Sequence, residues 1–296
     1  MEIPSCRQSV SMRSLWVAIL EGMRAYSLND VHATRKRKDS WWTVFLVDPV
    51  ACRLTLLIAN HTDVTPNGLT RLSLVLGLAA AACFASGQLV AGAALFYVSF
   101  TVDCMDGKIA RLRETGTAFG LWLDYVGDRI RVVCCAAGLA FGQYGETGDI
   151  AFILLGAGVA VLDLFRYVNA PQMKRVREAV RENRPERPPG VPSPDRYPPD
   201  AVSPDRRPLR RLPLRRRAGR FLARHRVRSH LISGIEFHAA VFVVGPLIGS
   251  AALVPIATGA GVLLLLNEIV LIYRMWLFAR ATPAVPRSES PQRVPV

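Results

Sequence analysis

The chain has 296 residues, of which 51% are hydrophobic, and it carries a formal net charge of +14. A soluble domain rarely combines these two properties, whereas a membrane protein with basic loops does so readily. The charge is also concentrated, because residues 170–230 hold 18 Lys and Arg against 6 Asp and Glu. One basic segment beside apolar runs argues against nucleic acid as a partner and favours membrane lipids.

The N-terminal part of the chain is expected to lie at the membrane surface. Residues 1–40 are polar and mixed, and we expect a cytoplasmic segment that is partly disordered. The aromatic pair Trp41-Trp42 is suited to the membrane–water interface. Asp48-Pro49 indicates an N-cap followed by proline at the first helical position. Because Arg53 interrupts the apolar run, we predict an interfacial amphipathic helix over residues 41–63.

The six apolar segments that follow are each close to the roughly 20 residues that a helix needs to cross a bilayer. They predict an all-α fold, a polytopic membrane bundle of six transmembrane helices, in one domain over residues 64–282. Three of the connections contain no Lys or Arg, and the connections that alternate with them are basic. The positive-inside rule then places both termini in the cytoplasm, in a protein of the cell inner membrane. The predicted spans are residues 69–86, 89–112, 118–141, 150–168, 231–248 and 252–275.

A long basic insert over residues 171–228 separates the fourth and fifth predicted spans. Its proline-rich part, residues 188–213, repeats Ser-Pro-Asp-Arg and cannot build a core, so we expect it to be disordered. The arginines over residues 210–228 are expected to contact anionic lipid headgroups, with a specific partner site as the alternative. The tail over residues 283–296 is also expected to be disordered.

Four aspartates inside predicted spans are the main functional signal, because ionisable residues in a membrane are costly. Asp103 and Asp106 are three apart on the second span, and Asp124 and Asp128 are four apart on the third, so each pair shares a helix face. The short connection makes the two spans antiparallel, and the pairs can therefore meet. Four carboxylates in a medium of low dielectric need compensation, which Mg²⁺ or Mn²⁺ provides through oxygen ligands. The alternative is a buried salt-bridge network, although so many buried ions rarely serve stability alone.

The same region carries a more specific pattern: the run Asp103-Cys-Met-Asp106-Gly107-Lys-Ile-Ala110-Arg111 is followed by Gly120, Asp124 and Asp128. These eight fixed residues over 26 positions resemble the signature of the CDP-alcohol phosphatidyltransferases. The run Thr65-Pro66-Asn67-Gly68-Leu69-Thr70 resembles the segment that opens the first span of the family. The resemblance covers about residues 40–170.

The resemblance implies an integral-membrane enzyme of phospholipid biosynthesis. A substituted phosphate would move from a CDP-alcohol, usually CDP-diacylglycerol, to the hydroxyl of a small alcohol or alcohol phosphate, with release of CMP. The active site would face the cytoplasm, and the protein would be a homodimer. Two Mg²⁺ or Mn²⁺ ions would be held by Asp103, Asp106, Asp124 and Asp128, with Asp128 also the catalytic base. CDP binding is assigned by resemblance to Asn67, Thr70, Gly107, Ala110, Arg111 and Gly120.

The acceptor is expected to bind among polar side chains at the cytoplasmic ends of spans three to six. Two arginines can bind an acceptor phosphate there, although Asp163 and Arg166 are three apart and can instead pair with each other. The predicted pocket residues are Arg129, Asp163, Arg166 and Glu236, and His238 and Glu268 are further candidates.

Three alternatives stay open. The sequence around Asp124 also resembles the branch of the family that uses a soluble donor such as CDP-inositol. Intramembrane aspartates alone also permit a divalent-cation transporter, although no matching acidic set lies near the loops of the opposite face. A non-catalytic scaffold would be indicated by the loss of a signature residue, and none is lost.

Overall fold

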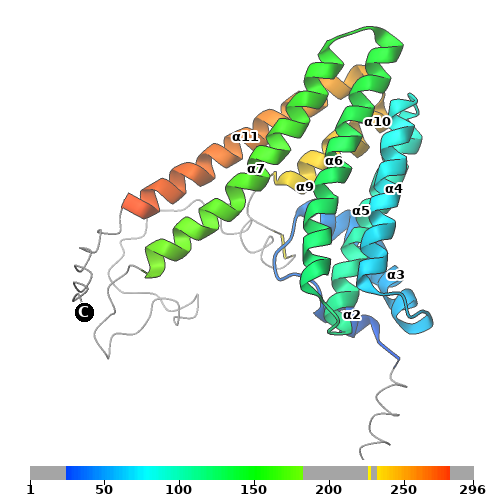
Figure 1. Ribbon diagram of the computed structural model, residues 1–296, viewed down its shortest axis with the longest axis vertical. Helices are drawn as coiled ribbons and strands as arrows, with labels where there is room; N and C mark the ends of the chain where they lie inside the picture. The colour runs from blue at the N-terminus through cyan, green and yellow to red at the C-terminus, as the bar shows by residue number, and fades with distance from the viewer. Residues whose placement is uncertain (1–24, 183–225, 228–231, 281–296) are drawn as a thin grey trace, which may run out of the picture.

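The computed structural model describes residues 25–182, 226–227 and 232–280, and Figure 1 shows them as a bundle of helices. These ranges contain no β-strand beyond an isolated bridge between Asp39 and Val227. The all-α membrane bundle predicted from the sequence is therefore confirmed. Its helices are α2 (Leu28–Ala33), α3 (Asp48–His61), α4 (Pro66–Ala85), α5 (Leu89–Leu112), α6 (Ala118–Thr147), α7 (Ala151–Glu182), α9 (Gly234–Ala239), α10 (Gly245–Ile248) and α11 (Ser250–Arg280).

Among the described residues, five helices are long and apolar enough to cross a membrane, where the sequence predicted six spans. Four of them coincide with predicted spans, namely α4, α5, α7 and α11. The third predicted span is α6, which is long enough but carries the charged residues of the signature. The fifth predicted span corresponds to one continuous apolar helix, Gly234–Ile248, which is shorter than the five candidate spans. It consists of α9, a π-helical turn over Ala240–Val244, and α10. The remaining helix, Thr43–His61, falls in the region predicted as interfacial.

The helix that contains α3 does not begin at Asp48-Pro49, which the sequence indicated as a helix N-terminus. It is continuous from Trp41, through a π-helical turn at Thr43–Val47, into α3. Asp48 is therefore inside the helix and not at its N-cap, and its carboxylate pairs with the Lys108 ammonium at 2.9 Å. The π turn ends at Val47, two residues before Pro49, whose nitrogen has no N–H to donate.

The fourth predicted span also continues further than expected. α7 runs to Glu182 with Pro171 inside it, so the first part of the predicted insert is helical. The proline-rich repeats and the tail over residues 283–296, both predicted to be disordered, lie outside the described residues. Of the insert beyond α7, the structure describes Arg226 and Val227.

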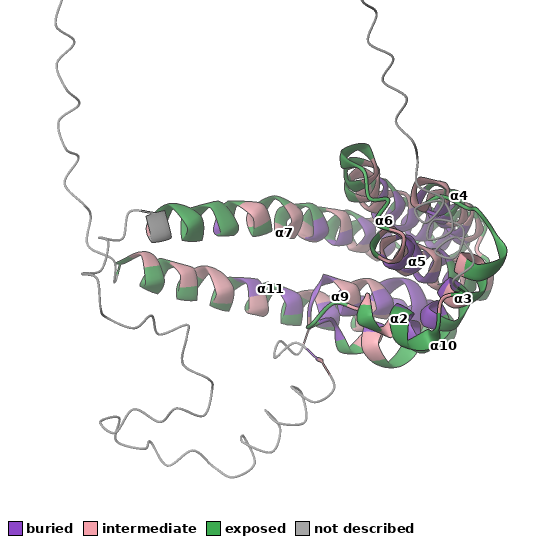
Figure 2. Ribbon diagram, turned by 90° about the horizontal axis from the view of Figure 1, so that it is seen from below, coloured by how far each residue is buried: buried purple, intermediate pink, exposed green. Residues whose placement is uncertain are grey.

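The helices fall into two groups that diverge toward one end of the molecule. α4, α5 and α6 pack side by side, whereas α7 and α11 pair with each other and lean away (Figure 1). Figure 2 shows that buried residues gather where the first group meets α9 and α10. Residues of both groups line a cavity at the end of the bundle where α5 ends and α6 begins.

Glycines on α6 allow its backbone to approach α4 closely. A Cβ atom at Gly138 would lie 2.3 Å from the carbonyl oxygen of Ala81, and one at Gly142 would lie 2.0 Å from that of Phe84. The two glycines are four apart, which is the usual spacing of small residues at close contacts between membrane helices. The contact fixes α4 and α6 against each other along their upper halves in Figure 1.

Replacing Gly142 by Val should force α4 and α6 apart and lower the free energy of unfolding by about 1–3 kcal/mol, the usual cost of overpacking. Unfolding of the purified protein in detergent, by heat or by SDS, measures the effect. Gly145→Val is the matched control, because a Cβ atom at Gly145 meets nothing within 4 Å. Equal stability of the two variants would contradict the close packing.

Candidate active site

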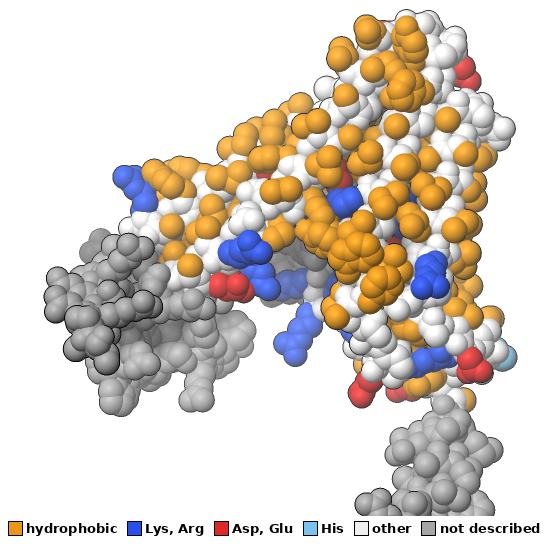
Figure 3. All heavy atoms as spheres, viewed as in Figure 1, with side chains coloured by type: hydrophobic (Ala, Val, Ile, Leu, Met, Phe, Trp, Pro, Cys, Tyr) orange, Lys and Arg blue, Asp and Glu red, His pale blue; other side chains and the backbone are white. Residues whose placement is uncertain are grey.

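A cavity of about 790 Å³ opens where the two helix groups diverge. Figure 3 shows basic side chains around a hollow in this part of the molecule and apolar side chains over the helices above it. Every residue predicted to bind metal or CDP lines this one cavity. The set comprises Asn67, Thr70, Asp103, Asp106, Gly107, Ala110, Arg111, Gly120, Asp124 and Asp128.

Three carboxylates meet on the wall of the cavity that α5 and α6 form. Oxygen atoms of Asp103, Asp106 and Asp124 lie within 4.8 Å of one another. Asp103 and Asp106 share a face of α5 because they are three residues apart, and the antiparallel α6 presents Asp124 to that face. Like charges so close together repel unless a cation lies among them, and three hard oxygen ligands fit Mg²⁺ or Mn²⁺.

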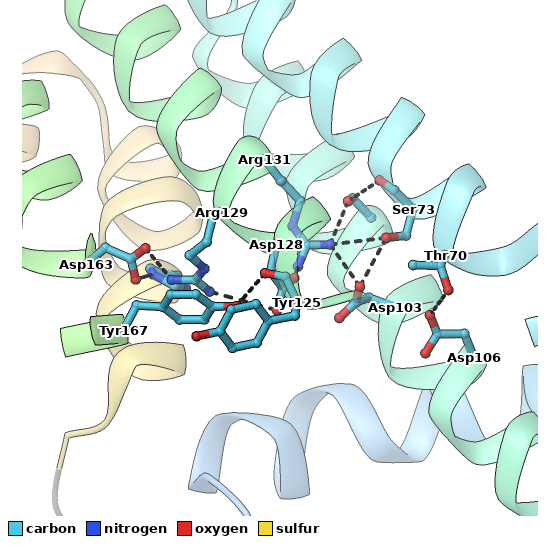
Figure 4. Close-up of polar contacts among 12 residues, drawn as sticks. Thr70, Ser73, Asp103, Asp106, Tyr125, Asp128, Arg129, Arg131, Asp163 and Tyr167 are labelled. Atoms are coloured by element: carbon cyan, nitrogen blue, oxygen red, sulfur yellow. Dashed lines mark hydrogen bonds and ion pairs between the residues drawn. The ribbon is translucent and has the colours of Figure 1, made fainter. Parts of the chain in front are cut away.

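Two hydroxyl groups of α4 orient the carboxylates of α5, as Figure 4 shows. The Thr70 hydroxyl donates to Asp106 Oδ2 at 2.5 Å, and the Ser73 hydroxyl donates to Asp103 Oδ1 at 3.1 Å. Thr70 and Ser73 are three apart and therefore lie on the face of α4 that packs against α5. Ser73 was not predicted, although a serine one turn after Thr70 in an apolar span was a usable signal.

A buried arginine on α6 links the two aspartate pairs. The Arg131 guanidinium lies 3.4 Å from Asp103 Oδ1 and also pairs with Asp128 Oδ1. It donates to the hydroxyls of Ser73 and Ser99 at 3.3 Å each. Its aliphatic stem lies against α4 at Gly77, where a Cβ atom would be 2.6 Å from Arg131 Cγ and Cδ. Arg131 was not predicted as a site residue, and the structure shows it as a counter-ion of Asp103 and Asp128.

Asp128 does not join the other three carboxylates. It follows Asp124 by one helical turn, a rise of about 6 Å, so it lies deeper along α6. One of its oxygens pairs with Arg131, and the other lies 3.8 Å from Arg129 Nη2. With a side chain that is 29% exposed, Asp128 faces the cavity while two arginines hold its orientation.

Arg129 belongs to a second polar cluster between α6, α7 and α9. It pairs with Asp163, which also accepts a hydrogen bond from His238 Nε2 at 2.7 Å. The guanidinium stacks over the Tyr167 ring, 4.2 Å from its centroid, and the Tyr167 hydroxyl donates to the Tyr125 carbonyl oxygen at 2.6 Å. Arg129, Tyr167 and His238 line the cavity, whereas Asp163 lies behind them and is almost completely buried.

The pairing of Asp163 with Arg166, which the spacing permitted, does not occur. Arg166 turns instead toward α11, where its Nε lies 3.5 Å from Glu268 Oε1. Its guanidinium also lies against the backbone at Gly234, where a Cβ atom would be 2.0 Å from Nη1. Arg166 thus crosses from α7 to the start of α9 and lines the cavity.

Glu236 has a different position from the one predicted. Its carboxylate accepts the Ser233 N–H at 2.8 Å and forms a capping box at the start of α9. The other carboxylate oxygen accepts the Trp41 N–H at 3.0 Å. Glu236 is 5% exposed and does not line the cavity, because both its oxygens satisfy helix N-termini.

At the opposite side of the cavity, Asn67 contacts the start of α6. Its amide donates to the Thr117 hydroxyl at 3.5 Å, and Thr117 caps α6 by accepting the Gly120 N–H. A Cβ atom at Gly120 would lie 2.4 Å from Asn67 Oδ1, so glycine allows α4 and α6 to meet here. The first turn of α6, which contains Gly120 of the signature, is therefore held against the Thr65–Thr70 run at the start of α4.

Residues 63–183 match the model of the family described as CDP-alcohol phosphatidyltransferase. The archaetidylinositol phosphate synthase of Methanothermobacter thermautotrophicus is 36% identical over 116 residues, which is 39% of this chain and 54% of that protein. A CDP-diacylglycerol–serine O-phosphatidyltransferase of Helicobacter pylori is 30% identical over 105 residues, 33% of this chain and 44% of that protein. The chain thus spans about half the length of the curated relatives that it matches.

A similar solved structure is the phosphatidylinositol phosphate synthase of Mycobacterium tuberculosis with CDP-DAG bound. The similarity covers 80% of this chain and 95% of that chain, with 19% sequence identity and a TM-score of 0.45. A second structure of that synthase, in complex with manganese and citrate, has 18% identity and a TM-score of 0.44.

Proposed function

We propose that this chain is an integral-membrane transferase of the CDP-alcohol phosphatidyltransferase family, whose model its residues 63–183 match. It moves a substituted phosphate from a CDP-alcohol to the hydroxyl of an acceptor alcohol and releases CMP. The observation that carries the proposal is the meeting of Asp103, Asp106 and Asp124 within 4.8 Å, in the cavity that the other signature residues line.

The side chains of the chain fit the steps of this transfer. The acceptor oxygen bonds to the phosphorus that bears the donor alcohol, and the P–O bond to CMP breaks. Asp128 faces the cavity and takes the hydroxyl proton, while Arg131 holds its other oxygen. Divalent ions at the three clustered carboxylates, with Asp128 beside them, would offset the charge on the phosphate oxygens.

The donor that we propose is CDP-diacylglycerol, which would make the protein an enzyme of phospholipid biosynthesis. The support is the similarity to a phosphatidyltransferase of H. pylori whose name specifies this donor. A soluble donor such as CDP-inositol is the alternative outcome of the test below.

We place the active site at the cytoplasmic face of the inner membrane, with both termini cytoplasmic. The connection between α5 and α6, at the cavity end of the bundle, contains Arg113, and the last turn of α5 contains Arg111. The connections at the opposite end contain no Lys or Arg. This distribution agrees with the positive-inside rule. The proposal of a homodimer rests on the family resemblance alone.

The test of the reaction is incubation of the purified protein with CDP-diacylglycerol or CDP-inositol and a panel of acceptors: inositol phosphate, glycerol phosphate and serine. CMP release that depends on Mg²⁺ or Mn²⁺, with a product of the expected mass, would support the transfer and identify both alcohols. If neither donor yields CMP with any acceptor, the proposal fails. Metal flux into liposomes without a CDP-alcohol would favour a transporter.

A phosphorylated acceptor should depend on Arg166, because its guanidinium reaches the cavity between α7 and α9. Arg166→Gln should raise the KM for that acceptor about tenfold or more, the effect of one charge-assisted hydrogen bond, and leave the KM for the donor unchanged. Arg175→Gln is the matched control, because Arg175 is exposed on the same helix and does not line the cavity. Initial rates at varied acceptor concentration give the KM for the acceptor, and initial rates at varied donor concentration give the KM for the donor. An unchanged acceptor KM in Arg166→Gln would exclude this role.

A further inference from the structure

The segment that follows α2 contributes to the wall of the cavity. We call residues 34–39 the entrance segment, and three of its side chains, Arg35, Lys36 and Asp39, line the cavity beside the aspartates. The segment lies outside the matched family region, which begins at residue 63. It brings positive charge to a site whose other wall is strongly acidic.

The entrance segment is fixed at both of its ends. At its start, the Thr34 carbonyl oxygen accepts the Arg111 Nε–H at 2.7 Å, so the segment touches the helix that carries the signature. At its end, the Asp39 N–H donates to the Arg226 carbonyl oxygen at 2.9 Å, and the Arg226 guanidinium donates to the Lys36 carbonyl oxygen.

Arg226 is itself anchored to the bundle. Its Nη1 lies 3.8 Å from Asp48 Oδ2, and the other oxygen of Asp48 pairs with the Lys108 ammonium at 2.9 Å. Lys108 and Asp48 are both buried, so the chain of contacts ends in the packed interface of α3 and α5. The backbone at Lys36 is therefore held in place relative to the aspartates.

The Lys36 side chain lines the same cavity as Asp103, Asp106 and Asp124. Arg37, the next residue, is exposed and does not line the cavity. A flexible ammonium at this position can reach the anionic part of a ligand that lies against the aspartate wall.

We propose that Lys36 binds the diphosphate of the CDP-alcohol donor, from the side of the cavity opposite to the aspartate wall. The inference rests on the proposed function. Donor phosphates that lie at the carboxylate cluster would have Lys36 and Arg111 facing them, and the Thr34 contact orients Arg111 for the same ligand. The site thus includes a residue that the signature does not contain.

The test measures binding of CDP, CMP and cytidine to the purified full-length protein in detergent with Mg²⁺, by isothermal titration calorimetry. Lys36→Gln should weaken CDP binding about tenfold, the effect of one charge-assisted contact, weaken CMP binding by less, and leave cytidine binding unchanged. Arg37→Gln removes the same charge from the neighbouring position and should change CDP affinity less than twofold. Lys36→Arg keeps the charge and should remain within about threefold of the wild type.

The outcomes separate this inference from the proposed function. If the wild type binds CDP and Lys36→Gln binds it equally well, the role of Lys36 is wrong and the transferase proposal is untouched. The role of Lys36 is also wrong if Lys36→Gln weakens cytidine binding as much as CDP binding, because cytidine has no phosphate. It is wrong as well if Arg37→Gln weakens CDP binding as much as Lys36→Gln does, because the effect would then not depend on the position of the charge. If the wild type binds no CDP and releases no CMP from either donor, the proposed function itself fails.

Discussion

Replacement of Asp124 by Asn should reduce metal-dependent CMP release by roughly a thousandfold, because the charge stabilisation that a bound metal supplies is several kcal/mol. Asp124 is the contribution of α6 to the three-carboxylate cluster, whereas Asp103 and Asp106 both come from α5. Asparagine keeps the size of the side chain and removes one negative charge. A loss of CMP release in this variant would therefore come from the lost charge and not from altered packing.

The variant should also bind Mn²⁺ more weakly, which electron paramagnetic resonance of free Mn²⁺ measures without any substrate. Asp149→Asn is the matched control: Asp149 is exposed at the opposite end of the bundle, where its carboxylate accepts the Ala151 N–H at 2.9 Å. Asparagine can make the same capping contact, so this variant should keep wild-type turnover and Mn²⁺ affinity. Full turnover of Asp124→Asn would contradict the proposed metal site.

The spacing of residues along single helices predicted much of the cavity wall. Positions three and four apart placed Asp103 with Asp106 and Asp124 with Asp128, and the short connection predicted that the two helices meet. The structure brings three of these four carboxylates together. The fourth, Asp128, lies one turn further along the axis of α6. Residue spacing predicts which face of a helix a side chain is on, but not how far along the axis it lies from a neighbouring helix.

Contacts between helices far apart in the sequence could not be predicted in this way. Asp163 and Arg166 satisfied the local rule for an ion pair, yet Asp163 pairs with Arg129 on α6 and Arg166 pairs with Glu268 on α11. A buried carboxylate pairs with the cation that the fold places nearest to it. Residue spacing within one helix does not show which cation of another helix that is. Glu236 was misplaced for the same reason, since Trp41, its partner, is 195 residues away.

Hydropathy did not identify all the long helices of the bundle equally well. Hydropathy identified α4, α5, α7 and α11 as spans, because these helices are apolar along most of their length. It was less decisive for α6, where the charges of the site lower the mean hydropathy of a helix that packs along α4. The functional residues therefore weaken the signal that would identify the helix on which they lie.

Arg131→Met should destabilise the protein more than any other single change to the site. Arg131 contacts the carboxylates of Asp103 and Asp128, and its side chain is 4% exposed. Removal of one partner from a buried ion pair leaves an uncompensated charge and costs about 3–5 kcal/mol. SDS-induced or thermal unfolding in detergent, without divalent ions, measures this loss.

Lys174→Met provides the comparison for stability. Lys174 pairs with Glu178 at 3.6 Å, but the two side chains are 79% and 53% exposed, and exposed pairs contribute about 0–1 kcal/mol. If Arg131→Met costs no more than Lys174→Met, Arg131 is not the counter-ion of the aspartates.

The dependence of stability on metal should distinguish a lost counter-ion from a lost packing contact. Without Arg131, the carboxylates of Asp103 and Asp128 carry more uncompensated charge, so a divalent ion that binds the folded state relieves more repulsion. Added Mg²⁺ should then raise the unfolding temperature of Arg131→Met by more than that of the wild type, through preferential binding to the folded protein. An equal or smaller rise would mean that the cost of the substitution lies in the packing against Gly77 and not in electrostatics.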